Sequence, residues 1–202
     1  MTPPDPVPTG TRADPQAGSD RPVRADARRN RDKLIAVART AFTTGGDTAT
    51  LEGIARAAGV GIGTLYRHFP TREALVEAVY AAELDDVTTS APALLDEFPP
   101  EAALRAWMDR YAAFFAAKHG MLDALRVSWA SGSVTTSGTR ERITAALGMI
   151  LAAGARTGTL RGDVAADDVT MLLLGVFLSL GGDRTPEQTA RLLDLVVDAV
   201  RP

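Results

Sequence analysis

The sequence of 202 residues contains no cysteine and only two histidines, His68 and His119. The absence of cysteine excludes a disulfide framework, a thiolate metal site and a cysteine nucleophile. Two histidines leave little material for a histidine-rich metal site or a conventional catalytic triad. The chain also lacks a run of 18 uncharged apolar residues, so no membrane-spanning helix is predicted. We therefore expect a protein without a metal or cofactor.

The first 24 residues are rich in proline and carry few large apolar side chains. Because this segment has no apolar core region, it does not resemble a secretory signal, and we expect a cytoplasmic protein. Its composition is typical of a disordered arm over residues 1–24. Hydrophobic residues make up 46% of the whole chain, which is enough for a substantial core.

The net charge of -3 conceals an uneven distribution along the chain. Residues 21–80 hold ten basic and six acidic residues, whereas residues 81–202 hold eleven basic and sixteen acidic ones. A basic module therefore precedes an acidic remainder. This division indicates a polyanionic partner for the first module alone.

Apolar residues recur every three or four positions, and no segment alternates with the period of a strand, so we predict an all-α fold. The first helix is expected from Asp26 to about residue 44, and Thr50, Thr71 and Thr185 are expected N-caps of later helices. The remaining helices are predicted at about 50–58, 62–69, 71–87, 100–118, 121–131, 138–156, 166–181 and 186–200, with a mobile loop over residues 131–138.

The segment from Gly59 to Phe69, GVGIGTLYRHF, places three glycines around a short helix, although glycine costs about 1 kcal/mol relative to alanine in a helix interior. Together with the helix that begins at Thr50, it fits a helix-turn-helix in which Gly59 makes the turn. The second helix of such a unit enters the major groove of DNA. Glycines there would let the helix backbone approach the duplex closely. The alternative is an ordinary helical hairpin with a buried tyrosine.

Residues Thr50 to Val79, TLEGIARAAGVGIGTLYRHFPTREALVEAV, resemble the DNA-binding domain of the TetR family of bacterial transcription regulators. The resemblance covers residues 26–85. It implies an N-terminal three-helix helix-turn-helix domain over residues 25–70, a connecting helix over 71–87, and a larger helical domain for effector binding and dimerisation over 88–202. The implied DNA contacts are made to phosphates by Thr50, Tyr66, His68 and Arg72, to base edges by Gly61, Ile62, Gly63 and Thr64, and by a basic arm with Arg24, Arg28 and Arg29.

The last two predicted helices are apolar on nearly all sides, which indicates that they are covered on several sides. We expect them to form a homodimer interface, because a chain of this size hardly buries both helices alone. The alternative is that both are core helices of a monomer. The expected interface residues are Val169, Leu172, Leu173, Val176, Phe177, Leu180, Leu192, Leu193, Val196 and Val197.

Aromatic residues gather in the predicted helices 100–118 and 121–131. The family resemblance implies an effector in the middle of the larger domain, and these residues are candidates for its walls. The alternative for each of them is an ordinary place in the core. The candidates are Trp107, Met108, Tyr111, Phe115, Met121, Leu125, Trp129 and Met149.

The favoured interpretation is a homodimeric repressor that a small-molecule effector releases from its double-stranded DNA operator. A non-specific architectural DNA-binding protein is the first alternative, but it would be basic along its whole length. An enzyme is the second. Its paired acids, Asp85-Asp86 and Asp167-Asp168, resemble solvated helix caps, and the sequence offers no set of nucleophile, base and orienting residue.

Overall fold

A computed structural model of the chain describes residues 20–45, 48–119, 121–132, 136–179 and 185–202, and the elements in these ranges are α-helices. They are α1 (Asp20–Gly45), α2 (Leu51–Ala57), α3 (Ile62–His68), α4 (Arg72–Thr88), α5 (Ser90–Glu97), α6 (Pro100–His119), α7 (Leu122–Ser131), α8 (Thr136–Thr157), α9 (Ala166–Ser179) and α10 (Pro186–Ala199). The predicted all-α class is confirmed.

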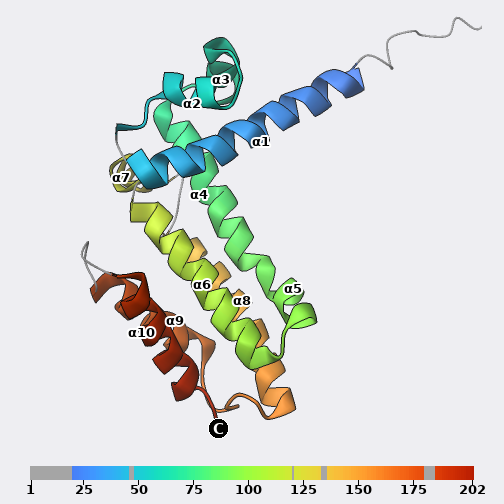
Figure 1. The fold of residues 1–202 in the computed structure, drawn as a ribbon, viewed down its shortest axis with the longest axis vertical. Coiled ribbons are helices and arrows are strands. Elements are labelled where there is room, and N and C mark those ends of the chain that lie inside the picture. The colour runs from blue at the N-terminus through green and yellow to red at the C-terminus, as the bar shows by residue number, and fades with distance from the viewer. Residues whose placement is uncertain (1–19, 46–47, 120, 133–135, 180–184) are drawn as a thin grey trace, which may run out of the picture.

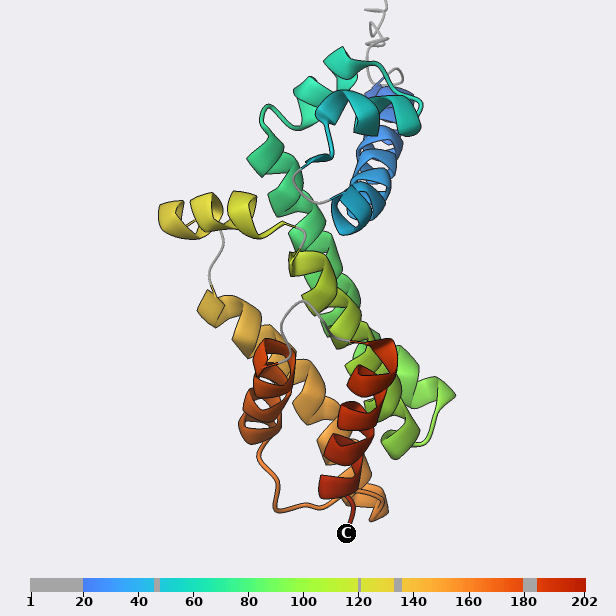
Figure 2. The same cartoon turned by 60° about the vertical axis from the view of Figure 1, so that its left-hand side comes forward.

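The helices form two lobes that α4 connects (Figure 1). Helices α1, α2 and α3 make the small lobe, and α1 projects beyond it. Helix α4 starts in the small lobe and continues beside α6 and α8 in the larger one, which α9 and α10 complete. Figure 2 shows the same division after a rotation, with α4 and α6 joining the two ends of the molecule.

The core of the small lobe is built from the apolar stripes that the sequence predicts. Leu34 and Phe42 of α1 are buried against Leu65 of α3 and Val76 of α4. Ala55 of α2 is also buried, and its small side chain allows the two short helices to lie close together. Helix α4 is therefore part of this lobe as well as its link to the rest.

The larger lobe has its own apolar core, centred on α6. Trp107 of α6 is fully buried, and its indole N–H donates to the carbonyl of Val87 at 3.1 Å, near the C-terminal end of α4. The Ser90 hydroxyl donates to the same carbonyl at 2.8 Å, and the indole bond adds a second side-chain donor that fixes α6 against the end of α4. Leu147 of α8, Leu173 of α9 and Leu193 of α10 complete this core and have no exposed surface.

Several boundaries differ from the predicted ones. Helix α1 begins at Asp20, ahead of the predicted start at Asp26, so the last residues of the predicted arm are helical. Helix α5 was not predicted; Pro92 near its start argues against a helix, but proline is tolerated in a first turn because no intrahelical N–H bond is lost there. Residues 1–19, residues 133–135 of the loop predicted over 131–138 and the predicted end of α9 at residue 181 lie outside the described residues. Residues 136–138 of that predicted loop already belong to α8.

Among the described helices, none combines the length and the apolar character needed to cross a bilayer. The described residues also hold no cluster of three or more histidine, aspartate or glutamate side chains placed to bind a metal ion.

Candidate nucleic-acid interface

The turn between α2 and α3 follows from local signals in the sequence. Thr50 is the N-cap of α2, and its hydroxyl accepts a hydrogen bond from the N–H of Gly53 at 3.1 Å. At the other end Gly59 has φ +67° and donates to the carbonyl of Arg56, while Val60 donates to that of Ala55 at 3.0 Å. These two bonds form the Schellman pattern, in which a left-handed glycine closes a helix. The predicted turn at Gly59 is thus confirmed, and it sets the direction of α3.

Helix α3 separates its side chains into an inner and an outer set. Leu65 is fully buried and Phe69, just after the helix, is 2% exposed, so both anchor it to the small lobe. Ile62 is 39% exposed and Tyr66 is 44% exposed, both unusually high values for large apolar or aromatic residues. Thr64 lies half-buried. The outer set presents a methyl surface and a phenolic hydroxyl to solvent. The exposure of Tyr66 disagrees with the alternative of a helical hairpin with a buried tyrosine.

Gly61 and Gly63 lie on this outer surface, and a Cβ atom added to either glycine would meet nothing within 4 Å. Neither residue has the positive φ that favours glycine. The fold of this chain therefore does not require glycine at either position. If a close approach to the α3 backbone explains these two glycines, the approaching molecule is not part of this chain.

The predicted phosphate contacts at the ends of the short helices have different surroundings. His68, the last residue of α3, is half-buried, with its ring centroid 6.2 Å from that of Phe69. Arg72, at the start of α4, donates a hydrogen bond to the carbonyl of Ala49 and lies over the Phe42 ring, 4.9 Å from its centroid. Arg72 therefore holds α4 against the residue that precedes Thr50. Its phosphate contact stays a prediction.

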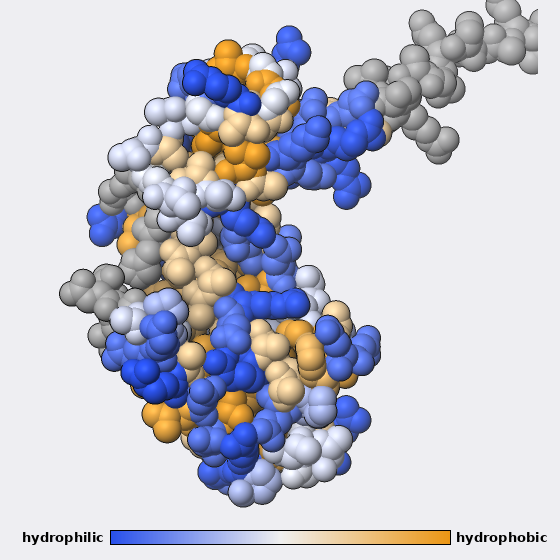
Figure 3. Space-filling view, viewed as in Figure 1, coloured by the Kyte–Doolittle hydropathy of each residue, from blue (hydrophilic) through white to orange (hydrophobic). Residues whose placement is uncertain are grey.

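The basic face of α1 lies beside this surface. Arg28 and Arg29 are exposed, and Arg29 pairs with Asp26; the side chain of Arg24 lies outside the described residues. Arg31, which the sequence did not single out, lies over the Phe69 ring at 5.5 Å and brings a cation to the end of α3. Its position three residues before Leu34, on the side that packs toward α3, is the signal that could have identified it. Figure 3 shows α1 as a hydrophilic arm that projects from the small lobe.

The candidate effector residues form a packed aromatic cluster in the larger lobe. The Tyr111 ring meets that of Phe177 edge-on at 5.2 Å, and Phe115 stacks on Phe177 at 5.3 Å. Burial raises the pKa of Tyr111 to about 12. Six of the predicted residues are buried together here: Trp107, Met108, Tyr111, Phe115, Met121 and Leu125. The side chain of Trp129 lies outside the described residues.

Met149 does not join this cluster. It lies on α8 and is 49% exposed, so its prediction as a pocket wall is corrected to a place on the surface. Helix α8 places one face in the core and the other outward, and residue 149 falls on the outer face, between the buried Leu147 and Ile150.

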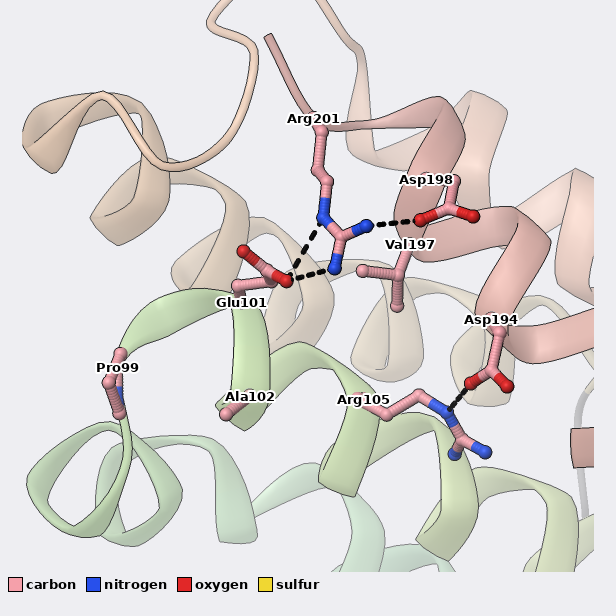
Figure 4. Close-up of a pocket in the computed structure, with 8 residues that line it drawn as sticks. All are labelled: Pro99, Glu101, Ala102, Arg105, Asp194, Val197, Asp198 and Arg201. Atoms are coloured by element: carbon pink, nitrogen blue, oxygen red, sulfur yellow. Dashed lines mark hydrogen bonds and ion pairs between the residues drawn. The ribbon is translucent and has the colours of Figure 1, made fainter.

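Two clefts in the described part of the structure are lined by none of the residues of the aromatic cluster. One, of about 430 Å³, runs between the start of α6 and the end of α10 (Figure 4). Across it Arg105 pairs with Asp194 at 2.6 Å, and Arg201 pairs with Glu101 and Asp198. The Arg105–Asp194 and Arg201–Glu101 pairs join α6 to the end of α10, so both arginines already have carboxylate partners within the chain.

The predicted dimer residues divide into buried and exposed ones. Val169, Leu173, Phe177, Leu193, Val196 and Val197 are at most 4% exposed. Because they are already covered within one chain, they supply its own core rather than an interface, and this corrects the prediction. Leu172 is 48% exposed, Val176 and Leu192 are half-buried, and Leu180 lies outside the described residues. The large apolar side chains that α9 and α10 turn outward are Met171, Leu172, Leu178 and Leu195, with exposed fractions of 47%, 48%, 65% and 62%.

Comparison with known proteins agrees with this arrangement. A family model described as "Bacterial regulatory proteins, tetR family" matches residues 34–79, and one described as "Transcriptional regulator SbtR-like, C-terminal domain" matches residues 99–202. The HTH-type transcriptional regulator SAUSA300_2515 of Staphylococcus aureus is 32% identical over 77 residues, which are 38% of this chain and 42% of that protein. The chain thus spans less than half the length of this curated relative.

Two solved structures are similar over most of their length. The TetR transcriptional regulator SCO0520 from Streptomyces coelicolor is 46% identical, with a TM-score of 0.76 over 85% of this chain and 98% of that one. A TetR transcription regulatory protein from Mycobacterium vanbaalenii is 34% identical, with a TM-score of 0.71 over 90% of this chain and 100% of that one. The similarity therefore includes both lobes.

Proposed function

The chain belongs to the TetR family of bacterial regulatory proteins and is a DNA-binding transcriptional regulator, and we propose that it is a homodimeric repressor that a small molecule releases from its operator. In this proposal it acts in the cytoplasm, on double-stranded DNA. The single observation that carries the proposal is the outer face of α3, which exposes Ile62 and Tyr66 beside two glycines that the fold does not need.

This face suits a major groove in shape and in chemistry. The Tyr66 hydroxyl is a donor for a phosphate oxygen, and Ile62 offers a methyl surface for the methyl group of thymine. Gly61 and Gly63 allow the backbone of α3 to approach the base edges. Since Gly61, Ile62 and Gly63 carry no hydrogen-bonding side chains, we propose that DNA shape contributes much of the sequence preference.

Dimerisation is proposed through the outward face of α9 and α10. One helix-turn-helix reads only a few base pairs, and a symmetric pair reads two half-sites about one or more turns of DNA apart. The exposed side chains of Met171, Leu172, Leu178 and Leu195 supply the apolar surface that such a pairing would cover.

The effector is proposed to bind at or beside the aromatic cluster around Tyr111. This cluster contacts α4 through Tyr80, whose ring lies 5.4 Å from that of Phe114. A ligand that favours a different arrangement of α4 would alter the spacing of the two α3 helices in a dimer. A tenfold weakening of operator binding needs only about 1.4 kcal/mol of difference in ligand affinity between the two states.

Selection of duplex DNA from a random pool by the purified protein tests the assignment. We expect an inverted repeat to be enriched, and a small-molecule screen on that repeat to yield compounds that release the complex. Tyr66→Phe is the matched variant, since it removes one hydroxyl; it should weaken binding to the selected and to unrelated sequences alike, by about tenfold for one bond to a charged acceptor.

A pool that gains no common sequence would support the architectural alternative and would contradict a specific regulator. The charge distribution disfavours that alternative, because residues 81–202 carry five more acidic than basic residues.

A further inference from the structure

Three acidic residues in the C-terminal half of α4 face two different lobes of the molecule. Glu83 and Asp86 both pair with Arg39 of α1, and the Arg39–Asp86 contact is 2.5 Å. Asp85 pairs with Arg142 of α8, also at 2.5 Å. Successive residues of a helix point about 100° apart, so Asp85 and Asp86 necessarily face different neighbours. These carboxylates are therefore ion-paired to other helices, although the side chains of Asp85 and Asp86 stay exposed to solvent.

The pair on the side of α1 is the less solvated one. Glu83 is 9% exposed, and burial raises its pKa, while the Arg39 guanidinium partly offsets that rise. Removing one partner from a desolvated ion pair is strongly unfavourable, because the other charge is left uncompensated. Sliding or tilting of α1 along α4 would move Arg39 away and leave the Glu83 carboxylate without a compensating charge. The contact thus favours one position of α1 on α4.

A cleft of about 460 Å³ adjoins the ion pair, and its lining includes Arg39 of α1, Glu83 and Asp86 of α4, and Arg110 of α6. Apolar side chains such as Leu34 and Phe42 pack α1 into the core, and the ion pair adds a directional contact between the small lobe and the C-terminal half of α4.

The opposite side of α4 is held to α8. Arg142 also donates to the Thr88 hydroxyl at 2.8 Å, and the Tyr80 hydroxyl shares a hydrogen bond of 2.9 Å with that of Thr139. Thr139 and Arg142 both belong to the first part of α8. The Tyr80 ring lies against Phe114, which in turn stacks on Tyr111 of the aromatic cluster. A displacement of side chains in the aromatic cluster would therefore be transmitted to the C-terminal half of α4, which also carries the two partners of Arg39.

We propose that Arg39 is a positioning residue that sets the orientation of the DNA-binding lobe through Glu83 and Asp86, and that Arg142, through Asp85, sets the position of α4 on the larger lobe. The effect on operator binding rests on the function proposed above. The positioning itself does not, because it is a property of the free chain.

Distance measurements between spin labels test this directly, because a chain without cysteine accepts labels only where cysteine is introduced. Arg56 of α2, Ala81 of α4 and Arg156 of α8 are exposed and serve as label sites. The 56–81 pair reports the small lobe relative to α4, and the 56–156 pair reports it relative to α8. Labelled chains are diluted with unlabelled ones, so that only distances within a chain are measured, without DNA or effector.

Arg39→Ala should broaden or shift the distance distributions of both pairs. Arg142→Ala should broaden only the 56–156 distribution, because the α1–α4 contact stays intact. Arg39→Lys keeps the charge and should stay close to the parent. Arg201→Ala is the matched control: it breaks the ion pair with Glu101 of α6 and a local one with Asp198 of α10, so neither distribution should change.

Unchanged distributions in Arg39→Ala would overturn the positioning role and leave the regulator assignment standing. If Arg39→Ala does not fold, the double variant Glu83→Gln/Asp86→Asn keeps the shape of both side chains and removes their charges, and a 56–81 distribution equal to that of the parent would overturn the proposal in the same way. Failure to select any operator would instead concern the proposed function alone.

Discussion

The two ends of the molecule expose surfaces of different kinds. At the end formed by α3, the exposed residues are two glycines, an isoleucine, a tyrosine and an arginine, Arg67, beside the arginines of α1. At the end formed by α9 and α10, they include four long aliphatic or thioether side chains, of which Leu178 is 65% exposed. The first surface is well solvated and suits reversible binding of a polyanion. The second is suited to lasting cover, because large apolar side chains gain most from removal from water.

The largest effect should follow from placing a charge on the second surface. Leu195→Glu puts a carboxylate on the outward face of α10, and in a symmetric pair the change occurs twice at the same interface. Burying an unpaired charge costs about 3–5 kcal/mol, so the dimer dissociation constant should rise by at least about 100-fold. Analytical ultracentrifugation across a micromolar concentration series measures it.

Phe98→Glu is the control for this variant. Phe98 is also a large apolar residue with 37% exposure, but it follows α5 and belongs to neither α9 nor α10. It should leave the dimer unchanged. Equal weakening by both variants would show that surface charge alone accounts for the effect, and a parent protein that sediments as a monomer would remove the distinction between the two surfaces.

Smaller effects are expected from Gly63→Ala on the first surface: the free energy of unfolding should rise, and operator affinity should fall. Alanine favours a helix over glycine by up to about 1 kcal/mol, and the added methyl group meets no atom of the chain, so the free energy of unfolding should rise. Against DNA the same methyl group would separate two closely packed surfaces, which costs about 1–3 kcal/mol and lowers operator affinity by about tenfold or more. Urea unfolding and fluorescence anisotropy with the selected operator measure the two quantities. An increase in both would mean that the backbone of α3 does not approach the duplex.

The smallest effect should come from Glu83→Gln, measured as a function of pH. Burial raises the pKa of Glu83 above its ordinary value of 4.5, so this group favours the folded state below about pH 4.5, and that contribution is lost as the pH rises through the folded-state pKa. Glutamine has no such titration. The unfolding free energy of the wild type, relative to Glu83→Gln, should therefore fall as the pH rises from 4.5 toward neutrality. A difference that grows in favour of the wild type over this range would mean that the Arg39 attraction outweighs burial.

Local signals predicted the first surface well. The Thr50 cap and the turn at Gly59 each depend on residues within about one turn of one another, and each is confirmed. Residues whose neighbours come from distant parts of the chain were missed. Arg39 and Asp86 are 47 positions apart, and no periodicity relates them.

The second surface shows a different limit. Helix α9 has apolar residues on nearly every side, so its sequence predicts that it is covered without indicating which side meets the chain's own core. Leu172 and Leu173 are neighbours with the same chemistry, yet one is 48% exposed and the other has no exposed surface. Only the packing of α8 and α10 against α9 decides between them.

Helix α4 contributes Leu75 and Val76 to the core of the small lobe, and Leu84 and Val87 to that of the larger one. Cutting the chain at any peptide bond between residues 72 and 88 would therefore expose part of one core or the other. The lobes therefore share one folding unit, and heating should melt them in a single cooperative transition instead of two. A fragment that ends before α4 would lack Leu75 and Val76 from its own interior, and we expect that such a fragment does not fold by itself.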